Sequence, residues 1–145
     1  MMRRVILALA LVGVYFSARA LQVHYSTGVT PCSINDVWDC GIVNRGPYSV
    51  ILGVPVALIG VLGYIFLFAV EALKKWRLMA AAAVGALAFS LYLTHIEARI
   101  LQVWCEYCVG SLITISLVTL LAIIQLVLRR RSRAPENQAA TMAAK

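Results

Sequence analysis

The sequence predicts an all-α integral membrane protein, a four-helix bundle with an extracytoplasmic loop between its first and second helices. Two observations predict this class. Of the 145 residues, 62% are hydrophobic and only 13% are charged, and the hydrophobic residues come in long uncharged blocks. An average soluble domain is about half apolar and about a quarter charged. A chain of this length cannot bury that much apolar surface in a soluble core.

Four blocks are long enough to cross a bilayer, whose hydrocarbon core of about 30 Å needs about 20 apolar residues of helix. The first block contains Arg19, which can reach the membrane interface along its apolar stem. Its basic start and the sequence Ala18-Arg19-Ala20 also fit a signal peptide with a small-residue cleavage site, and this alternative stays open. We expect one membrane domain over residues 1–133, with spans at about residues 5–25, 50–73, 78–101 and 105–128.

The positions of the basic residues predict the orientation. Ten of the thirteen Lys and Arg residues lie in short clusters, at the N-terminus, at residues 74–77 and from residue 129 onward. The positive-inside rule places these clusters, and so both termini, in the cytoplasm, and residues 26–49 and 97–108 outside. Clusters beside apolar blocks also argue against nucleic-acid binding, despite the net charge of +7. Residues 134–145 are polar and alanine-rich, which predicts a disordered cytoplasmic tail.

All four cysteines, Cys32, Cys40, Cys105 and Cys108, fall on the predicted outer side, where disulfides can persist. Cys105 and Cys108 form a C-x-x-C at the start of the fourth predicted span. Residues three apart share a helical face, and the free N–H groups of a helix start stabilise a thiolate. Such a thiolate at the bilayer edge lies within reach of a lipid-soluble electron acceptor. Cys32 and Cys40 are separated by a short polar segment that a disulfide can close.

Three interpretations of these cysteines compete. Extracytoplasmic cysteines commonly form structural disulfides, and four thiolates can bind zinc tetrahedrally. Structural zinc sites usually combine two closely spaced pairs, whereas this chain has one, so we expect no metal. A C-x-x-C that opens a helix suits thiol–disulfide exchange better than cross-linking. The pattern therefore favours a redox relay, and a membrane scaffold with two inert disulfides is the non-enzymatic alternative.

The loop cysteine pair is followed by Tyr48-Ser49-Val50-Ile51-Leu52-Gly53-Val54-Pro55 and, at the fourth predicted span, by Trp104-Cys105-Glu106-Tyr107-Cys108. In this order the motifs resemble the vitamin K epoxide reductase family, over roughly residues 5–130. The resemblance implies a helix bundle around a quinone of the ubiquinone, menaquinone or vitamin K type, in a bacterial inner membrane. It also implies roles: Cys108 faces the quinone, Cys105 exchanges with Cys40, and Cys32 completes the shuttle disulfide.

For bacterial members, the resemblance implies a quinone-dependent thiol oxidoreductase that generates disulfides, with a thioredoxin-like extracytoplasmic protein as the electron donor. The alternative is a reductase of vitamin K epoxide or vitamin K quinone driven by dithiols. Vertebrate members have an Asn near the start of the second span and a Tyr four residues after the last active-site cysteine. Ser49 and Leu112 stand at those places here. Both are therefore quinone-site candidates, and the difference weakens the epoxide interpretation. No thioredoxin-like domain follows the fourth predicted span, so we expect the partner to be a separate chain.

His95, Glu97 and Arg99 are ionisable residues near the outer end of the third predicted span. Ionisable residues at membrane depth are functional candidates, and one of these could supply a proton during quinone reduction. For these three residues, we favour the other interpretation, in which they lie at an interfacial helix end in contact with lipid headgroups.

Overall fold

The computed structural model describes residues 1–28 and 32–143, with side chains up to residue 132. Four long helices form most of it: α1 (Met2–Tyr25), α3 (Val56–Ala72), α4 (Trp76–Ile96) and α5 (Glu106–Ala143). Among the described residues, three helical segments are long and apolar enough to cross a membrane: Met2–Tyr25, Trp76–Leu101 and Glu106–Ser132. The predicted class, an all-α membrane protein, is confirmed.

The fourth apolar helix, α3, is shorter, with 17 residues. At 1.5 Å per residue its length is about 26 Å, which lies at the lower limit for a membrane span. By length alone, α3 is therefore only marginally able to cross a bilayer.

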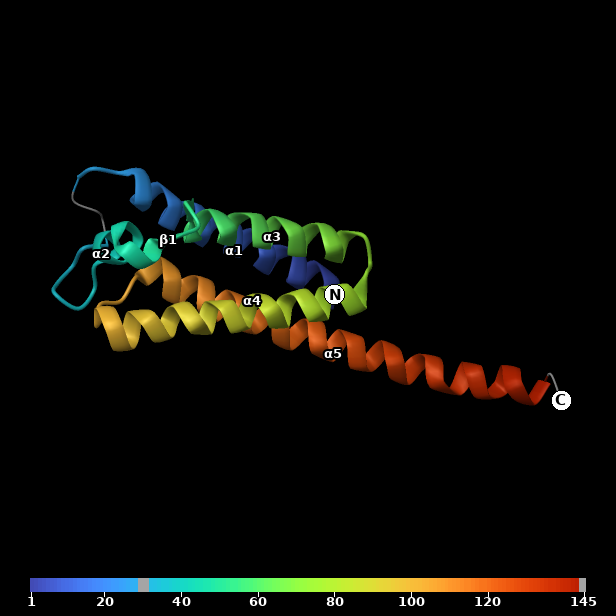
Figure 1. The fold of residues 1–145 in the computed structure, drawn as a ribbon. Helices are drawn as coiled ribbons and strands as arrows, with labels where there is room; N and C mark the ends of the chain where they lie inside the picture. Colours follow the sequence, from blue (N-terminus) through green and yellow to red (C-terminus); the bar gives the residue numbers. More distant parts are fainter. Residues whose placement is uncertain (29–31, 144–145) are drawn as a thin grey trace.

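The long helices lie side by side (Figure 1), and α1 packs against both α3 and α5. Helix α5 packs in turn against α4, whereas α3 and α4, although a short turn joins them, contact each other much less than these three pairs do. The apolar core between the helices contains Ile6, Leu67, Met79 and Val118, all nearly inaccessible to solvent. Helix α1 therefore holds the arrangement together, and the seam between α3 and α4 is its loosest part.

Two glycines permit this close packing. A side chain at Gly13 on α1 would overlap the ring of Tyr64 on α3. A side chain at Gly110 on α5 would lie 2.7 Å from the ring of Phe16 on α1. Small residues at helix contacts let backbones approach closely, which is how helices commonly associate in membranes.

The remaining elements gather at one end of the helices (Figure 1). They are α2 (Cys40–Arg45), the short 3-10 helix η1 (Pro47–Ser49), and strands β1 (Val50–Ile51) and β2 (Val54–Pro55). The start of α5 lies at this same end, and the N-terminus and the α3–α4 turn lie at the other. All four cysteines are consequently at one end of the protein.

The predicted second span, residues 50–73, starts too early. Residues 50–55 form a hairpin of two antiparallel strands, and helix α3 begins only after it. The two residues at its turn, Leu52 and Gly53, have φ angles of 52° and 81°. Positive φ at both central residues is characteristic of a two-residue hairpin turn. Pro55, which has a fixed φ and no N–H, then precedes the first helical residue. A short apolar run does not by itself distinguish strand from helix.

The third predicted span, residues 78–101, corresponds to α4 together with a π-helical turn, η2 (Glu97–Leu101). The turn ends at Gln102, which has a left-handed φ of 54°. A π turn is uncommon and is frequent at functional sites. The end of α4 is therefore the irregular part of an otherwise regular helix.

Helix α5 continues to Ala143 and so covers most of residues 134–145, the predicted tail. Alanine, the strongest helix former, recurs in this segment and accounts for the helical backbone. The disorder of the tail stays a prediction.

Candidate functional site

Cys40 is the first residue of α2, and Asp39 caps that helix. Asp39 Oδ1 accepts hydrogen bonds from the backbone N–H groups of Gly41 (2.7 Å) and Ile42 (3.1 Å), as a helix N-cap does. Burial acts to raise the pKa of Asp39, but hydrogen bonds from Ile42, Ser33 and Gly41, together with the nearby charge of Arg45, outweigh burial, and the pKa lies below its ordinary value. Cys40 forms a disulfide with Cys32, with the Cα atoms 5.7 Å apart. The cap therefore fixes one half of this disulfide.

A parallel bridge joins the disulfide loop to the chain just before α5. The Trp104 N–H donates to the Val37 carbonyl (2.7 Å), and the Asp39 N–H donates to the Trp104 carbonyl (3.1 Å). The Trp38 and Trp104 rings lie beside each other, with centroids 6.5 Å apart. Because Trp104 immediately precedes Cys105, the bridge brings the disulfide loop to the C-x-x-C pair.

Cys105 and Cys108 are both free thiols. Cys105 lies directly before α5 and is fully buried, in one apolar cluster with Cys32 and Cys40. Cys108, in the first turn of α5, is only half-buried and packs against this cluster. The structure thus brings all four predicted cysteines together at one place, with Cys108 at its edge.

Asn44 links the two cysteine pairs. Its buried side-chain amide donates to the Cys40 carbonyl (2.9 Å) and to Cys105 Sγ (3.2 Å). The Cys108 N–H also donates to Cys105 Sγ, at 3.4 Å. Hydrogen bonds from Cys108 and from Asn44 favour the thiolate and lower the pKa of Cys105, although burial opposes this. Cys105 is therefore prepared to act as the nucleophile of the pair.

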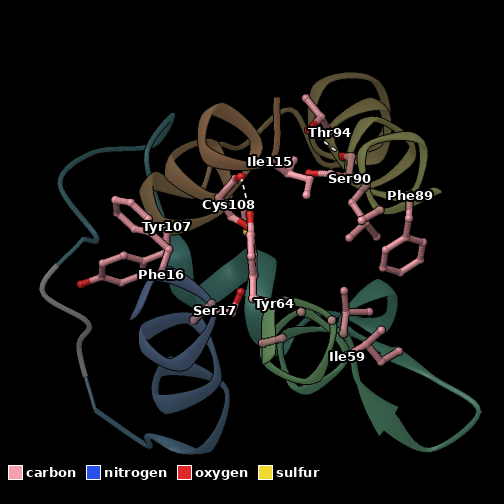
Figure 2. Close-up of a pocket in the computed structure, with 18 of the residues that line it drawn as sticks. Phe16, Ser17, Ile59, Tyr64, Phe89, Ser90, Thr94, Tyr107, Cys108 and Ile115 are labelled. Atoms are coloured by element: carbon pink, nitrogen blue, oxygen red, sulfur yellow. Dashed lines mark hydrogen bonds between the residues drawn. The ribbon is translucent and has the colours of Figure 1, made fainter. Parts of the chain in front are cut away.

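A cavity of about 340 Å³ lies next to Cys108 and is lined by residues of α1, α3, α4 and α5. Its walls are mostly apolar and include the rings of Phe16, Tyr64, Phe89 and Tyr107. In Figure 2 the Tyr64 ring points from α3 toward Cys108, and Phe89 stands on the α4 side. A volume of this size with an apolar and aromatic lining is typical of a small-molecule site.

Few polar side chains face the cavity, and some of them are already occupied. The Tyr64 hydroxyl donates to the Ser111 carbonyl (2.8 Å), and the Thr94 hydroxyl donates to the Ser90 carbonyl (2.9 Å). Ser17 lines the cavity from α1 and is 5% exposed, and its hydroxyl has no hydrogen bond to any other described residue. Since buried hydroxyls are normally hydrogen-bonded, Ser17 is available for a polar atom of a ligand.

Glu97 lines the cavity from the π-helical turn η2 and is only 4% exposed. Its Oε2 accepts a hydrogen bond from the Cys105 N–H (3.3 Å), and it lines both this cavity and a smaller adjoining one together with Cys108. His95 and Arg99, at the same helix end, are exposed. One member of the predicted ionisable group therefore lies against the cysteines, and the other two lie on the surface.

The two quinone candidates taken from the resemblance are not among the residues that line the main cavity. Ser49 lines a smaller adjoining cavity of about 40 Å³, together with Cys108, and its hydroxyl donates to the Gly46 carbonyl (2.7 Å). Leu112 packs, partly buried, against the apolar core of the helices. Their part in quinone binding stays a prediction.

Three residues of this site were not identified from the sequence: Asn44, Ser17 and Tyr64. Asn44 carries a usable signal, because it lies four residues after Cys40 and so on the same face of a short helix. A Ser within an apolar helix carries no such signal, since its hydroxyl can simply bond the backbone of its own helix. Only the packing of α1 against α3 shows that Ser17 and Tyr64 face one cavity.

A disulfide and a free C-x-x-C pair, set beside a ligand-sized cavity among membrane helices, define a membrane thiol oxidoreductase. The family model described as vitamin K epoxide reductase family matches residues 4–123, which is most of the chain. The chain belongs to this family, and the predicted membership is confirmed. Membership supports the oxidoreductase class and the membrane location, and family members in general are associated with quinones and thioredoxin-like partners.

Proposed function

We propose that this chain is a four-span, quinone-dependent thiol oxidoreductase that generates disulfides in extracytoplasmic proteins. Electrons pass from the dithiol of a thioredoxin-like partner to Cys32 and Cys40, then to Cys105 and Cys108, and finally to a membrane quinone. The proposal depends mainly on one observation: both cysteine pairs share a single buried cluster, and its edge, Cys108, lines the cavity.

The contacts of Asn44 support transfer between the pairs through Cys40 rather than Cys32. Its amide nitrogen donates to both the Cys40 carbonyl and Cys105 Sγ, so these two cysteines contact one side chain. A reduced Cys40 attacks Cys105 of an oxidised C-x-x-C pair and releases the Cys108 thiolate. Cys32 then attacks Cys40, which closes the loop disulfide and leaves Cys105 and Cys108 as free thiols. The structure has this arrangement of one disulfide and two free thiols.

The cavity residues fit a quinone head group. The rings of Phe16 and Phe89 provide apolar walls, and the unpartnered hydroxyl of Ser17 can donate a hydrogen bond to a carbonyl oxygen. A bound quinone supplies a ring that accepts two electrons. The protein excludes water from this ring and presents the Cys108 sulfur to it. The free C-x-x-C pair argues against a scaffold with two inert disulfides, because an inert pair would stay closed.

For the orientation, we propose that both termini face the cytoplasm of a bacterial cell and that the cysteine end faces outward across the inner membrane. Arg3 lies in the first turn of α1 and Lys74 in the turn between α3 and α4, and both the N-terminus and this turn lie opposite the cysteine end (Figure 1). Arg129 of α5 stacks on the ring of Trp76, the first residue of α4. A cytoplasmic excess of Lys and Arg sets the orientation of most membrane proteins. The disulfide loop then lies in an oxidising compartment, as its proposed role requires.

The test uses the purified protein in detergent with a soluble quinone, whose absorbance reports reduction. We expect Cys108→Ala to abolish reduction with any donor, and Cys32→Ala to spare reduction by dithiothreitol while blocking reduction by a thioredoxin-like protein. Ser116→Ala, an exposed hydroxyl on the same helix, serves as the control. Equal behaviour of the two cysteine variants with both donors would contradict the separate roles. Reduction of vitamin K epoxide with a dithiol as the electron donor would favour the alternative reductase.

A further inference from the structure

We propose that Glu97 accepts the proton of the Cys108 thiol and returns it to the quinone side of the cavity. The inference rests on the proposed quinone-linked function and assigns a second catalytic group to it. It treats Glu97 as part of the reacting centre, whereas the sequence favoured an interfacial helix end for this residue.

The position of Glu97 supports this role. Its Oε2 is held in place by the Cys105 N–H at 3.3 Å. Glu97 and Cys108 line both the main cavity and the smaller adjoining one. The carboxylate therefore faces the same space as the thiol that gives up a proton, and this is the space that a quinone oxygen would occupy.

The backbone around Glu97 is built to place it there. Residue 97 begins the π-helical turn η2, which closes with the left-handed Gln102 only three residues before Cys105. A π turn changes the direction of the side chains that follow it, and such turns are frequent at functional sites. A buried carboxylate at a membrane helix end is costly unless a role retains it.

Among the described residues, no Lys or Arg forms a salt bridge with Glu97, and the Cys105 N–H donates a hydrogen bond to its carboxylate. A buried carboxylate without a cationic partner is poised to take up a proton, because protonation removes an unfavourable buried charge. The other titratable groups that line the two cavities with it are His24 on α1, Tyr48 on η1, Tyr64 on α3, and Tyr107 and Cys108 on α5.

The reaction balances with Glu97 as the proton carrier. Two thiols and one quinone give one disulfide and one quinol, so two electrons and two protons leave the cysteines. The Cys108 proton moves to Glu97, and the resulting thiolate forms a bond to the quinone ring. Cys105 Sγ then attacks Cys108 Sγ, which forms the disulfide, breaks the bond between Cys108 Sγ and the ring, and leaves the electron pair on the quinol. Glu97 returns its proton to one quinol oxygen, and the proton of Cys105 accounts for the other.

Charge explains why a local acceptor is useful. Transfer of the proton from Cys108 to Glu97 leaves one negative charge in the cavity, on sulfur instead of oxygen. Release of the same proton to water would leave two negative charges side by side in a buried, apolar site, which is strongly unfavourable. An amide at that position cannot take up the proton, which would then have to leave the buried site for water.

The first experiment compares wild-type protein with Glu97→Gln and Glu97→Asp, using dithiothreitol and a soluble quinone. General acid–base catalysis by a positioned side chain contributes about 10²–10⁴-fold, so we expect kcat of Glu97→Gln to fall about 10²-fold near neutral pH. The KM for quinone should change little, and the pH dependence of kcat should flatten. Glu97→Asp keeps a carboxylate and should retain part of the rate. Glu106→Gln, an exposed carboxylate in the first turn of α5, is the matched control.

The second experiment needs no quinone. In the Cys105→Ser background, Cys108 is alkylated with a small maleimide, and the rate near neutral pH is compared with and without Glu97→Gln. If Glu97 accepts the proton, its loss slows alkylation. We expect an effect of about tenfold, which is one tenth of the effect expected on kcat. If Glu97 acts only as a repelling charge, its loss speeds alkylation. An equal or faster rate in Glu97→Gln overturns the proposal.

These measurements separate the two proposals. Wild-type protein that fails to reduce quinone contradicts the proposed function, while the alkylation rates still decide the role of Glu97. Unchanged kcat and pH profile in Glu97→Gln contradict the role of Glu97 alone. Thermal unfolding is measured for each variant. If Glu97→Gln does not fold, Glu97→Ala replaces it, because it also lacks the carboxylate, and alkylation as fast as with Glu97 overturns the proposal.

Discussion

Replacement of Asn44 by Ala should impair Cys105 more than it impairs the fold. The change removes two buried hydrogen bonds, to the Cys40 carbonyl (2.9 Å) and to Cys105 Sγ (3.2 Å). A buried neutral hydrogen bond contributes about 1 kcal/mol net, and one to a charged group about 1.5–3 kcal/mol. Since 1.4 kcal/mol is a factor of ten, the thiolate population of Cys105 at neutral pH should fall at least about tenfold.

The assay follows the ultraviolet absorbance of the Cys105 thiolate against pH in a Cys108→Ser background, with the loop disulfide intact. The Asn44 amide favours the charged form, so its loss should move the titration of Cys105 to higher pH. Exchange of Cys105 with the loop cysteines should slow in parallel, because the thiolate is the attacking species.

Asn35→Ala is the matched control. The Asn35 side chain accepts hydrogen bonds from Val37 and Trp38 in the same loop but touches neither free cysteine. This variant should alter the loop without moving the titration of Cys105. A titration unchanged in Asn44→Ala, or shifted equally in both variants, would refute the linking role of Asn44.

Three further predictions follow from the fold and the site. Reporter fusions at residue 36 should report an extracytoplasmic location and those at residue 75 a cytoplasmic one; the opposite pattern would place the cysteines in a reducing compartment. Cys105→Ser should give a new visible absorbance band when quinone is added, which disappears when Cys108 is also replaced; a spectrum equal to that of quinone alone would contradict a quinone-facing Cys108. Asp39→Ala should lower the free energy of unfolding by about 1 kcal/mol, as the loss of an N-cap does. Because the pKa of Asp39 is lowered in the folded protein, this contribution is present at neutral pH and is lost as pH falls through the lowered pKa, so unfolding of the variant should be less sensitive to acid below about pH 4.

Segment length and charge predicted α1, α4 and α5, because an apolar segment of about 20 residues with few charges has the length and composition of a membrane-spanning helix. The start of α3 was wrong for a local reason. Residues 50–55 are as apolar as the helix that follows, and the hairpin depends on the positive φ of Leu52 and Gly53. A leucine at such a position gives no warning in the sequence, since φ above zero is uncommon for residues other than glycine.

The cysteines could be predicted because their spacing is visible in the chain. The residues that support them could not, since their contacts join distant segments: the Asn44 amide and Cys105 Sγ are 61 positions apart. Glu97 was noted as one of three ionisable residues, and only burial separates it from the exposed His95 and Arg99. Side-chain direction in the π-helical turn, which no periodicity encodes, decides which of the three meets the thiols.

The weak contact between α3 and α4 has a consequence for how the two substrates reach the site. On this side the cavity is walled by Ile59 and Gly63 of α3 and Phe89 of α4, and a side chain at Gly63 would meet nothing within 4 Å. Under the proposed function, the isoprenoid tail of a quinone can rest in this seam, in the lipid, while the head group is inside. The protein donor arrives from the aqueous phase, at the disulfide loop. Two substrates of opposite solubility thus use separate entrances, and neither must depart before the other can bind.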